Sequence, residues 1–544
     1  MKSIKSCLPQ IQSDLKKAIK LLAFSAALPR FLRVQVTTER AESEIRRALD
    51  MREARFLELV RSQVYARPDS PYLKLLANAG CAFVDLETYV RHHGVEKALQ
   101  KLAGEGVYFT SDEYKGKKAV VRGGLSFNVC PFDFELPASS PGFVHESSGT
   151  RNVPVRSNSP LEWLALRTWA TAIFFSAHNL FSYAHAVYDG IPPGTALNHL
   201  LVNAKLGKRT ERWFARRIPA RNSLELAYFL AVTYLAVLIG KTYKPGLPMP
   251  EFVDLKDIHR IIRWLRDKQK NEERCYISCV ASSAARIARE ALEMGVSLEG
   301  TVFGVAGDPL TEQKESLIKK VNAATVSRYS YGGGVSTGYG CAQRMFRDEV
   351  HVNLHLLAVI SHPMPLPGYT LAIHSFFLST LHPAAPRLLL NVENGDYVQL
   401  DERDCGCALQ RAGLTLHLHH IQSYEKFTSE GMNYFYSDLF DLLEKTLPSE
   451  FGGGPGDYQL VEDEDNGGQT HLTLVIHPDV GDLREDRVLA QLRNAFSNGS
   501  RGNGFMTAVW ADAGTFKLKR AIPYASPRGK ILPLHLNHRR APRM

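Results

Sequence analysis

The sequence predicts an α/β fold, with a large N-terminal α/β lobe and a small α+β C-terminal lobe. Two stretches, residues 275–295 and 301–321, carry this prediction, because each reads as an apolar strand, a small-residue turn and an amphipathic helix. Such strand–helix units are typical of layered α/β domains, whose ligands bind beyond the carboxyl ends of the strands. Past about Leu414 the pattern changes to a helix and hairpin-like strands with glycine-rich turns, which indicates the small lobe.

The chain divides into three predicted regions. At 544 residues it is longer than one hydrophobic core usually supports. Residues 1–106 are expected to be a helical entry region, because apolar and charged residues recur there at three- and four-residue spacing. Residues 107–415 would form the core of the large lobe, and residues 416–544 the small lobe. Within the core, the apolar run from Arg387 to Val392 reads as a further strand.

Composition places the chain among ordinary globular proteins of the cytoplasm. The hydrophobic fraction is 44% and the charged fraction 22%. Eight cysteines are too sparse in so long a chain for a disulfide scaffold, which favours a reducing compartment. The net charge of +10 lies partly at the two ends and forms no stripe with aromatic residues, so nucleic acid is not expected as a partner. The apolar segment 227–240 is short for a membrane span and is expected to be a buried helix.

One loop has the composition of a phosphate cradle. Ser147, Ser148 and Thr150 offer hydroxyl groups, while Gly149 lets the backbone approach an anion closely. The spacing is not that of a Walker A loop. A simple serine–glycine turn between two elements explains the same residues, and the choice depends on the rest of the chain.

Several motifs stand together in one order along the chain. They are SSGT at 147–150, GDPLT at 307–311, YSYGGG at 329–334, NGD at 394–396, CGC at 405–407, EKFTSEGMN at 425–433 and SPRGKI at 526–531. In this order they resemble the phenylacetate-CoA ligase branch of the adenylate-forming superfamily, over roughly residues 70 to 535. The resemblance implies a large lobe and a small mobile lobe, with ATP and a carboxylic acid bound between them.

The resemblance also implies a reaction and the residues that serve it. ATP and the acid would give an acyl-adenylate and pyrophosphate, and a thiol or amine would then take the acyl group. Carried over by position, Ser147, Ser148, Gly149 and Thr150 would surround the phosphates, Gly307, Asp308, Pro309 and Tyr331 would lie beside the nucleotide, Asp396 would bind the ribose hydroxyls, and Lys530 would be the catalytic lysine. Glu425, Lys426 and Gly431 would lie near the hinge between the lobes.

A metal cluster is also implied by the resemblance. Cys341, His351, Cys405 and Cys407 resemble a cluster present in some relatives, and three thiolates with one imidazole suit tetrahedral Zn²⁺. Buried free cysteines are the alternative, since a C-x-C spacing is tighter than that of most zinc knuckles. His417 and His419 alternate as they would on one face of a strand, and ordinary core or surface histidines account for them.

The sequence departs from the family at charged and reactive positions. Arg151 and Asn152 follow SSGT, where the family continues with a threonine and a glycine. The segment 329–341 contains no acidic residue to help hold Mg²⁺. Gln422 stands where the family usually has an arginine, and Arg411 or Arg151 are the candidates to substitute for it. Asp308 and Arg151 are the candidates to take over the contacts to Mg²⁺ and phosphate.

Two functions of different class therefore stay open. One is a divergent ATP- and Mg²⁺-dependent acid ligase, with coenzyme A as the expected acceptor and an aryl or branched acid as substrate. Phe174, Phe175, His178, Phe181 and Tyr183 suit such an acid, although aromatic residues at this spacing also form plain core. The other is a binding or scaffold protein, or an enzyme acting on preformed acyl species. Expected partners are the small-molecule acid, a carrier protein and a second copy of the chain in a homodimer, but no membrane.

Overall fold

The structure is a computed structural model, and it describes most of the chain. The described residues are 2–146, 156–216, 223–331, 334–365, 372–423, 439–464, 470–498, 516–526 and 529–537. Two predicted segments lie outside them, the serine–glycine loop at 147–150 and the hinge segment at 425–431.

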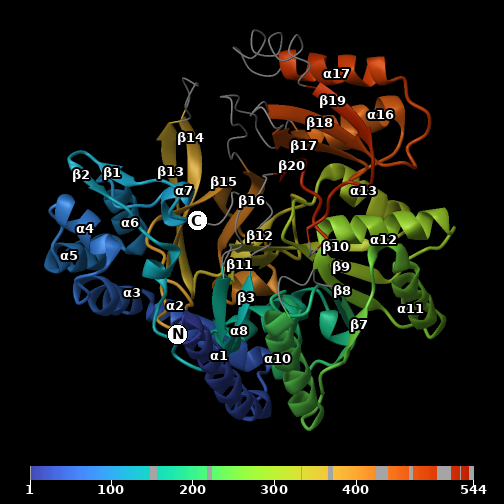
Figure 1. Ribbon diagram of the computed structural model, residues 1–544. Helices are drawn as coiled ribbons and strands as arrows, with labels where there is room; N and C mark the ends of the chain where they lie inside the picture. Colours follow the sequence, from blue (N-terminus) through green and yellow to red (C-terminus); the bar gives the residue numbers. More distant parts are fainter. Residues whose placement is uncertain are drawn as a thin grey trace.

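A mixed sheet runs through the large lobe (Figure 1). Within the described residues its strand order is β13-β14-β15-β16-β12-β11-β10-β9-β8-β5-β6-β7. The strands are β5 (Ala184–Tyr188), β6 (Thr210–Ala215), β7 (Pro250–Phe252), β8 (Cys275–Val280), β9 (Thr301–Ala306), β10 (Ala324–Tyr331), β11 (Val335–Gly340), β12 (Val350–Val352), β13 (Leu357–Pro365), β14 (Ala372–Thr380), β15 (Val392–Glu402) and β16 (Leu416–Ser423). The strands from β7 to β10 pair in parallel, and those from β10 to β13 pair antiparallel.

Helices cover both faces of the parallel half, which is why its central strands β5 and β8 are buried along their whole length. In β8 the alternate residues Cys275, Ile277 and Cys279 pack toward one layer, whereas Tyr276 packs toward the other. The first layer holds α11 (His259–Lys270), α12 (Ala281–Glu293) and α13 (Glu312–Lys320), after a short η4 (Leu255–Asp257). The second holds α1 (Lys2–Arg33), α8 (Leu161–Ala177), η3 (Leu180–Ser182), α9 (Ala196–Lys205) and α10 (Ser223–Lys241). The fold is α/β, as the sequence predicts.

The N-terminal part is helical up to residue 114, and its residues 52–114 pack on the antiparallel half of the sheet. Its further helices are α2 (Thr38–Asp50), α3 (Arg52–Val60), η1 (Arg61–Tyr65), α4 (Pro71–Asn78), α5 (Phe83–His93), α6 (Val95–Gly104) and α7 (Ser111–Tyr114). Two small hairpins follow, β1 (Val120–Arg122) with β2 (Leu125–Phe127) and β3 (Gly142–Glu146) with β4 (Arg156–Pro160), separated by η2 (Pro131–Phe134).

The predicted strand from Arg387 to Val392 is wrong. The segment is buried but irregular, and β15 begins only at Val392. Its backbone bonds go to separate partners, with Leu388 N–H donating to Phe134 O at 2.8 Å, and Asn391 has φ = 52°. The apolar composition therefore indicated a buried segment rather than a strand. The left-handed backbone at Asn391 interrupts regular pairing with a neighbouring strand.

The small lobe has a sheet of its own, in the order β19-β18-β17-β20. Its elements are η5 (Asp441–Thr446), α16 (Leu447–Phe451), β17 (Tyr458–Glu464), β18 (Thr470–Ile476), α17 (Glu485–Asn498), β19 (Phe516–Arg520) and β20 (Leu534–Asn537), and α14 (Ala408–Arg411) lies before it in the chain. Figure 1 shows this lobe above α12 and α13. Arg289 of α12 pairs with Asp457 and donates to Pro455 O at 2.8 Å, so the lobes touch through polar contacts.

Helix α10 differs from the expected buried helix. Its 18-residue window Leu224–Lys241 is long and apolar enough to cross a membrane, yet only 33% of it is buried. One side packs into the core through Phe229, Val232 and Val237, while Leu224 and Leu238 are exposed. Length and composition alone are weak evidence for a span, because core helices pass the same test.

Two buried histidines predict a loss of stability in acid. Burial lowers the pKa of His185 and of His355 to about 3, from an unfolded value near 6.5. Below pH 6.5 the unfolded chain therefore binds protons that the folded chain does not. The free energy of unfolding should fall by roughly 4 kcal/mol between pH 7.5 and 5, about 2 kcal/mol for each histidine. Urea unfolding across this range measures it, and His355→Phe should halve the slope, whatever its absolute stability.

Candidate active site and candidate metal centre

The turn after β9 holds Gly307 in a conformation that glycine favours, with φ = 89°. A Cβ placed on it would stand 3.1 Å from Cε and 3.5 Å from Nζ of Lys530. The structure thus brings the predicted catalytic lysine of the small lobe against the predicted nucleotide turn of the large lobe, although about 220 residues separate them. The open backbone at Gly307 leaves room for the lysine.

The lysine is held by a tight turn. Ser526 N–H donates to Lys530 O at 2.8 Å, and Lys530 N–H donates to Ser526 Oγ at 3.1 Å. Gly529, with φ = 82°, lies against the large lobe, where a Cβ would overlap Arg216 Nη1 and reach Ser283 Oγ at 2.9 Å. The left-handed φ and this close approach both favour glycine here.

A cationic surface lies at this contact. Arg216 follows β6, and Ser283 and Arg286 lie one turn apart on α12. Within the described residues, Arg216 Nη1, Ser283 Oγ and Arg286 Nη1 are buried and have no hydrogen-bond partner. Burial and then the neighbouring Arg216 lower the pKa of Arg286 to about 10. Buried positive charge without a partner is costly, so these groups suit an anion.

Asp308 does not project freely toward a ligand. Its carboxylate accepts from the N–H groups of Ala281 and Ser282, at 2.8 and 3.0 Å, and caps α12. Lys314 Nζ lies 3.7 Å from the same carboxylate and 3.2 Å from that of Glu444 in the small lobe. Asp308 therefore fixes the helix start and the lobe contact, which explains why α12 begins directly after β8. Pro309 contributes its carbonyl, which accepts from Lys314 Nζ at 3.2 Å.

Asp396 lies on β15 beside an aromatic residue that the sequence analysis did not single out. Its Oδ2 accepts from Tyr329 Oη at 2.5 Å and from Asn394 Nδ2 at 3.1 Å. Burial, together with the Asp396 carboxylate, holds the pKa of Tyr329 well above its usual value of 10, so the phenol stays a donor. Tyr331, two residues further on, is buried in the apolar core beside Tyr114.

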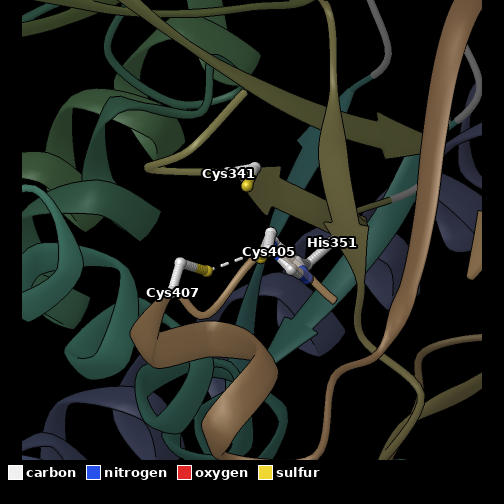
Figure 2. A group of neighbouring side chains, drawn as sticks. All are labelled: Cys341, His351, Cys405 and Cys407. Atoms are coloured by element: carbon white, nitrogen blue, oxygen red, sulfur yellow. Dashed lines mark hydrogen bonds between the residues drawn. The ribbon is translucent and has the colours of Figure 1, made fainter. Parts of the chain in front are cut away.

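The four predicted metal ligands come together (Figure 2). Cys341 follows β11, His351 lies on β12, and Cys405 and Cys407 precede α14. Their ligand atoms all lie within 4.8 Å of one another, and His351 Nε2 is 3.1 Å from the Cys407 sulfur and 3.6 Å from that of Cys405. Tetrahedral zinc ligands stand about 3.5 Å apart, given bonds of 2.0–2.3 Å. The donor set and its spacing fit Zn²⁺.

Neighbouring polar groups orient this cluster. His351 Nδ1 lies 2.6 Å from Leu414 O, which assigns the proton to Nδ1 and leaves Nε2 as a ligand. His417 is buried, its ring centroid 4.1 Å from that of His351, and its Nδ1 lies 2.6 Å from Glu349, which also pairs with Arg403. His417 is thus part of the surroundings of the cluster rather than an isolated core histidine.

The structure also separates some predicted residues. Arg411, a candidate substitute for the missing arginine, donates to Gly406 O beside the cysteines. Ser147, Ser148, Gly149, Thr150 and Arg151 lie outside the described residues. Tyr329, which lies inside the quoted YSYGGG segment, and Arg216, which directly follows β6, are candidate site residues that the sequence motifs did not point to.

Comparisons with known proteins give distant likenesses. No family model and no curated protein matches the chain. Among solved structures, an open conformation of 2-hydroxyisobutyryl-CoA ligase with 2-HIB-AMP and CoA is 11% identical, covers 82% of this chain and 90% of that chain, and has a TM-score of 0.43. Amide bond synthetase McbA from Marinactinospora thermotolerans is 12% identical, covering 91% and 98%, with a TM-score of 0.36. ATP-bound MatB from Rhodopseudomonas palustris is 12% identical, covering 72% and 66%, with a TM-score of 0.41. At such distances the function has to be inferred from this chain's own residues.

The approach of Gly529 to Arg216 predicts a specific defect. Gly529→Ala should slow the adenylate formation that Lys530 is predicted to catalyse by on the order of 100-fold, because a displacement of about 1 Å at a reacting group has such an effect. Hydroxamate formation measures it. Gly481→Ala, in the same lobe with nothing within 4 Å of its added Cβ, is the control. Equal rates in the two variants would remove the assigned role of Gly529.

Proposed function

We propose that the protein activates a carboxylic acid with ATP, as an acyl-adenylate, and transfers the acyl group to a thiol or amine, with coenzyme A as the preferred acceptor. The observation that carries this proposal is the contact of Lys530 with the Gly307 turn. The Lys530 ammonium lies beside the turn at the carboxyl end of β9, and ligands of α/β sheets bind beyond the carboxyl ends of the strands.

The residues divide the work in a way that suits this reaction. The Asp396 carboxylate has acceptor capacity for ribose hydroxyls, and Tyr329 fixes its orientation. A carboxylate oxygen of the acid attacks the α-phosphorus of ATP, the bond to the bridging oxygen breaks, and pyrophosphate leaves. Lys530 stabilises the charge that develops at the α-phosphate, and Arg216 and Arg286 supply positive charge for the leaving pyrophosphate.

Mg²⁺ normally helps to neutralise such phosphates, but the described residues give it no evident ligand set. The Asp308 carboxylate already accepts hydrogen bonds at the start of α12. Within the described residues, the two groups of side chains that could hold a metal ion both include the thiol of Cys341. We therefore propose that the protein groups which neutralise the charge of the phosphates are Lys530, Arg216 and Arg286. This assignment also accounts for the absence of an acidic residue in segment 329–341.

We further propose that the cluster of Cys341, His351, Cys405 and Cys407 binds one structural Zn²⁺. Four protein ligands would close the coordination sphere, which is the mark of structural rather than catalytic sites. The cluster ties the loop before α14 to β11 and β12. Its role is to hold the sheet on which Asp396 and Tyr329 lie.

The acid is proposed to be aryl or branched. Phe174 and Phe175 of α8 line a cavity beside β8 and β10, which gives an apolar wall for such a group. His178, by contrast, is engaged with Gly340 O at 2.9 Å, and Phe181 packs on Phe175.

A second candidate is a protein that binds preformed acyl species without adenylating them. The absence of an acidic residue from segment 329–341 favours it, because the usual protein ligand of Mg²⁺ is then missing. ATP binding separates the two candidates. An adenylating enzyme must bind ATP, whereas the alternative has no need of it.

The test is pyrophosphate release from ATP and Mg²⁺, with hydroxylamine as trap, across a panel of aryl and branched acids. Acid-dependent release, with a hydroxamate formed in equal amount, is the expected result. Acid-independent release would point to plain ATP hydrolysis. No release, with no ATP binding by calorimetry, would leave the second candidate.

A further inference from the structure

A small cavity lies between helices α8 and α9 and strands β8, β10 and β11. Besides the two phenylalanines, its lining includes two arginines, Arg167 and Arg328, and the hydroxyl-bearing Tyr276, Ser278 and Tyr339. An apolar acid would need no arginine there. The presence of Arg167 and Arg328 in the lining is therefore not explained by an apolar acid.

Neither guanidinium has a carboxylate partner within the part of the chain that the structure describes. Arg167 is only 8% exposed, and its Nε has no hydrogen-bond partner among those residues. Arg328 donates to Ser278 Oγ at 2.6 Å and to Gly304 O at 3.0 Å, with His199 Nδ1 3.2 Å away, and all three are neutral acceptors. Its Nε is buried and lacks a partner as well.

The energetics of this arrangement favour an anion. A buried guanidinium without a counter-charge is strongly unfavourable, and two in one cavity repel each other. Burial lowers the pKa of Arg167, and the neighbouring Arg328 lowers it further. The hydroxyl of Tyr276 is also buried without a partner, and it lies where a Cβ on Gly304 would overlap it. A carboxylate, with four acceptor sites and a shape that fits a guanidinium fork, would satisfy these donors.

Residues at the cavity lie close in the chain to residues of the candidate active site. Gly304, which accepts from Arg328, lies three residues before Gly307, roughly 10 Å away along β9. Arg328 directly precedes Tyr329, the residue bonded to Asp396. An acid whose reacting carboxylate lies at Lys530 would therefore extend along β9 toward the two arginines.

We infer that the acid substrate is a dicarboxylic acid, whose second carboxylate binds Arg167 and Arg328 while the first is activated. This inference rests on the proposed function for the identity of the first carboxylate. The aryl or branched part of the acid would pack against Phe174 and Phe175. A bidentate contact would involve Arg328, and Arg167 would complete the charge balance.

The test compares pairs of acids in which a methyl group replaces one carboxylate. Benzene-1,4-dicarboxylate is paired with 4-methylbenzoate, and 2-methylhexanedioate with 2-methylhexanoate, because the two carboxylates of each diacid lie at opposite ends of the molecule. For at least one pair, kcat/KM for hydroxamate formation should favour the diacid by on the order of 100-fold, the scale of a buried charge pair. Arg167→Met should lower the rate with the diacid by a similar factor without lowering that with the methyl partner. Arg266→Met, on the exposed side of α11, should change neither.

A binding measurement separates this inference from the proposed function. Calorimetry without ATP should show diacid binding that Arg167→Met and Arg328→Lys weaken, with circular dichroism confirming that both variants fold. No turnover with any acid, but arginine-dependent diacid binding, would overturn the adenylation and support the cavity assignment. Turnover that is equal or faster with the methyl partners, or no arginine-dependent binding, would overturn the dicarboxylic assignment.

Discussion

Lys530→Ala should lower the rate of acyl-adenylate formation by on the order of 100- to 1,000-fold, with little change in ATP affinity. The rate falls because one preorganised charged donor at a developing oxyanion contributes about that much. ATP affinity persists because Asp396 and the cationic surface around Arg216 are untouched. Single-turnover formation of adenylate measures the first quantity, and calorimetry measures the second.

Two controls sharpen this result. Lys519→Ala removes an exposed lysine from the same lobe and should leave the rate unchanged. Lys530→Arg keeps the charge but replaces the compact ammonium with a broad guanidinium, and should restore only part of the rate. Equal activity in Lys530→Ala and Lys519→Ala would contradict the assigned role.

Loss of the metal should give the largest change in stability. Protein purified without chelators should contain about one zinc per chain. Removing it, or replacing Cys407 with alanine, should lower the free energy of unfolding by about 5 kcal/mol or more, because the binding free energy of a closed zinc site contributes directly to folding. The Cys341 thiol and the His351 ring lower the pKa of the Cys407 thiol. The hydrogen bond with Cys407 raises the pKa of Cys341, and burial raises that of Cys405, so metal binding has to release protons from these two thiols.

Cys130→Ala provides the matched control. Cys130 is an exposed free cysteine outside the cluster, and its replacement should change neither the zinc content nor the unfolding midpoint. Protein that contains no zinc as purified, and that unfolds identically with and without a chelator, would show that the four residues are simply buried neighbours.

The sequence allowed the local architecture to be predicted where short periodic runs carry it. The units 275–293 and 301–320 read correctly as strand and helix, because strand burial and helix amphipathicity are local patterns. Arg387–Val392 failed because an apolar run reports burial rather than conformation. The small-residue turn predicted before the helix of the first unit is absent, because α12 begins directly after β8 and is capped by Asp308, 27 residues away in the chain.

The site was less accessible to sequence reasoning. That Lys530 meets Gly307 follows from how two lobes pack, and no spacing rule contains it. The metal cluster and Asp396 were named only through the resemblance. Arg167 lies within an apolar helix, and Arg328 within a strand, so neither looked different from a residue flanking the core. Their meaning depends on the cavity that they share.

Acid-dependent exchange of labelled pyrophosphate into ATP tests the central claim most directly, because it requires a reversible acyl-adenylate and is independent of the acceptor. We expect exchange that depends on the acid and is lost in Lys530→Ala. Absence of exchange with every acid of the panel, in zinc-loaded protein that is folded and binds no ATP, would contradict the claim.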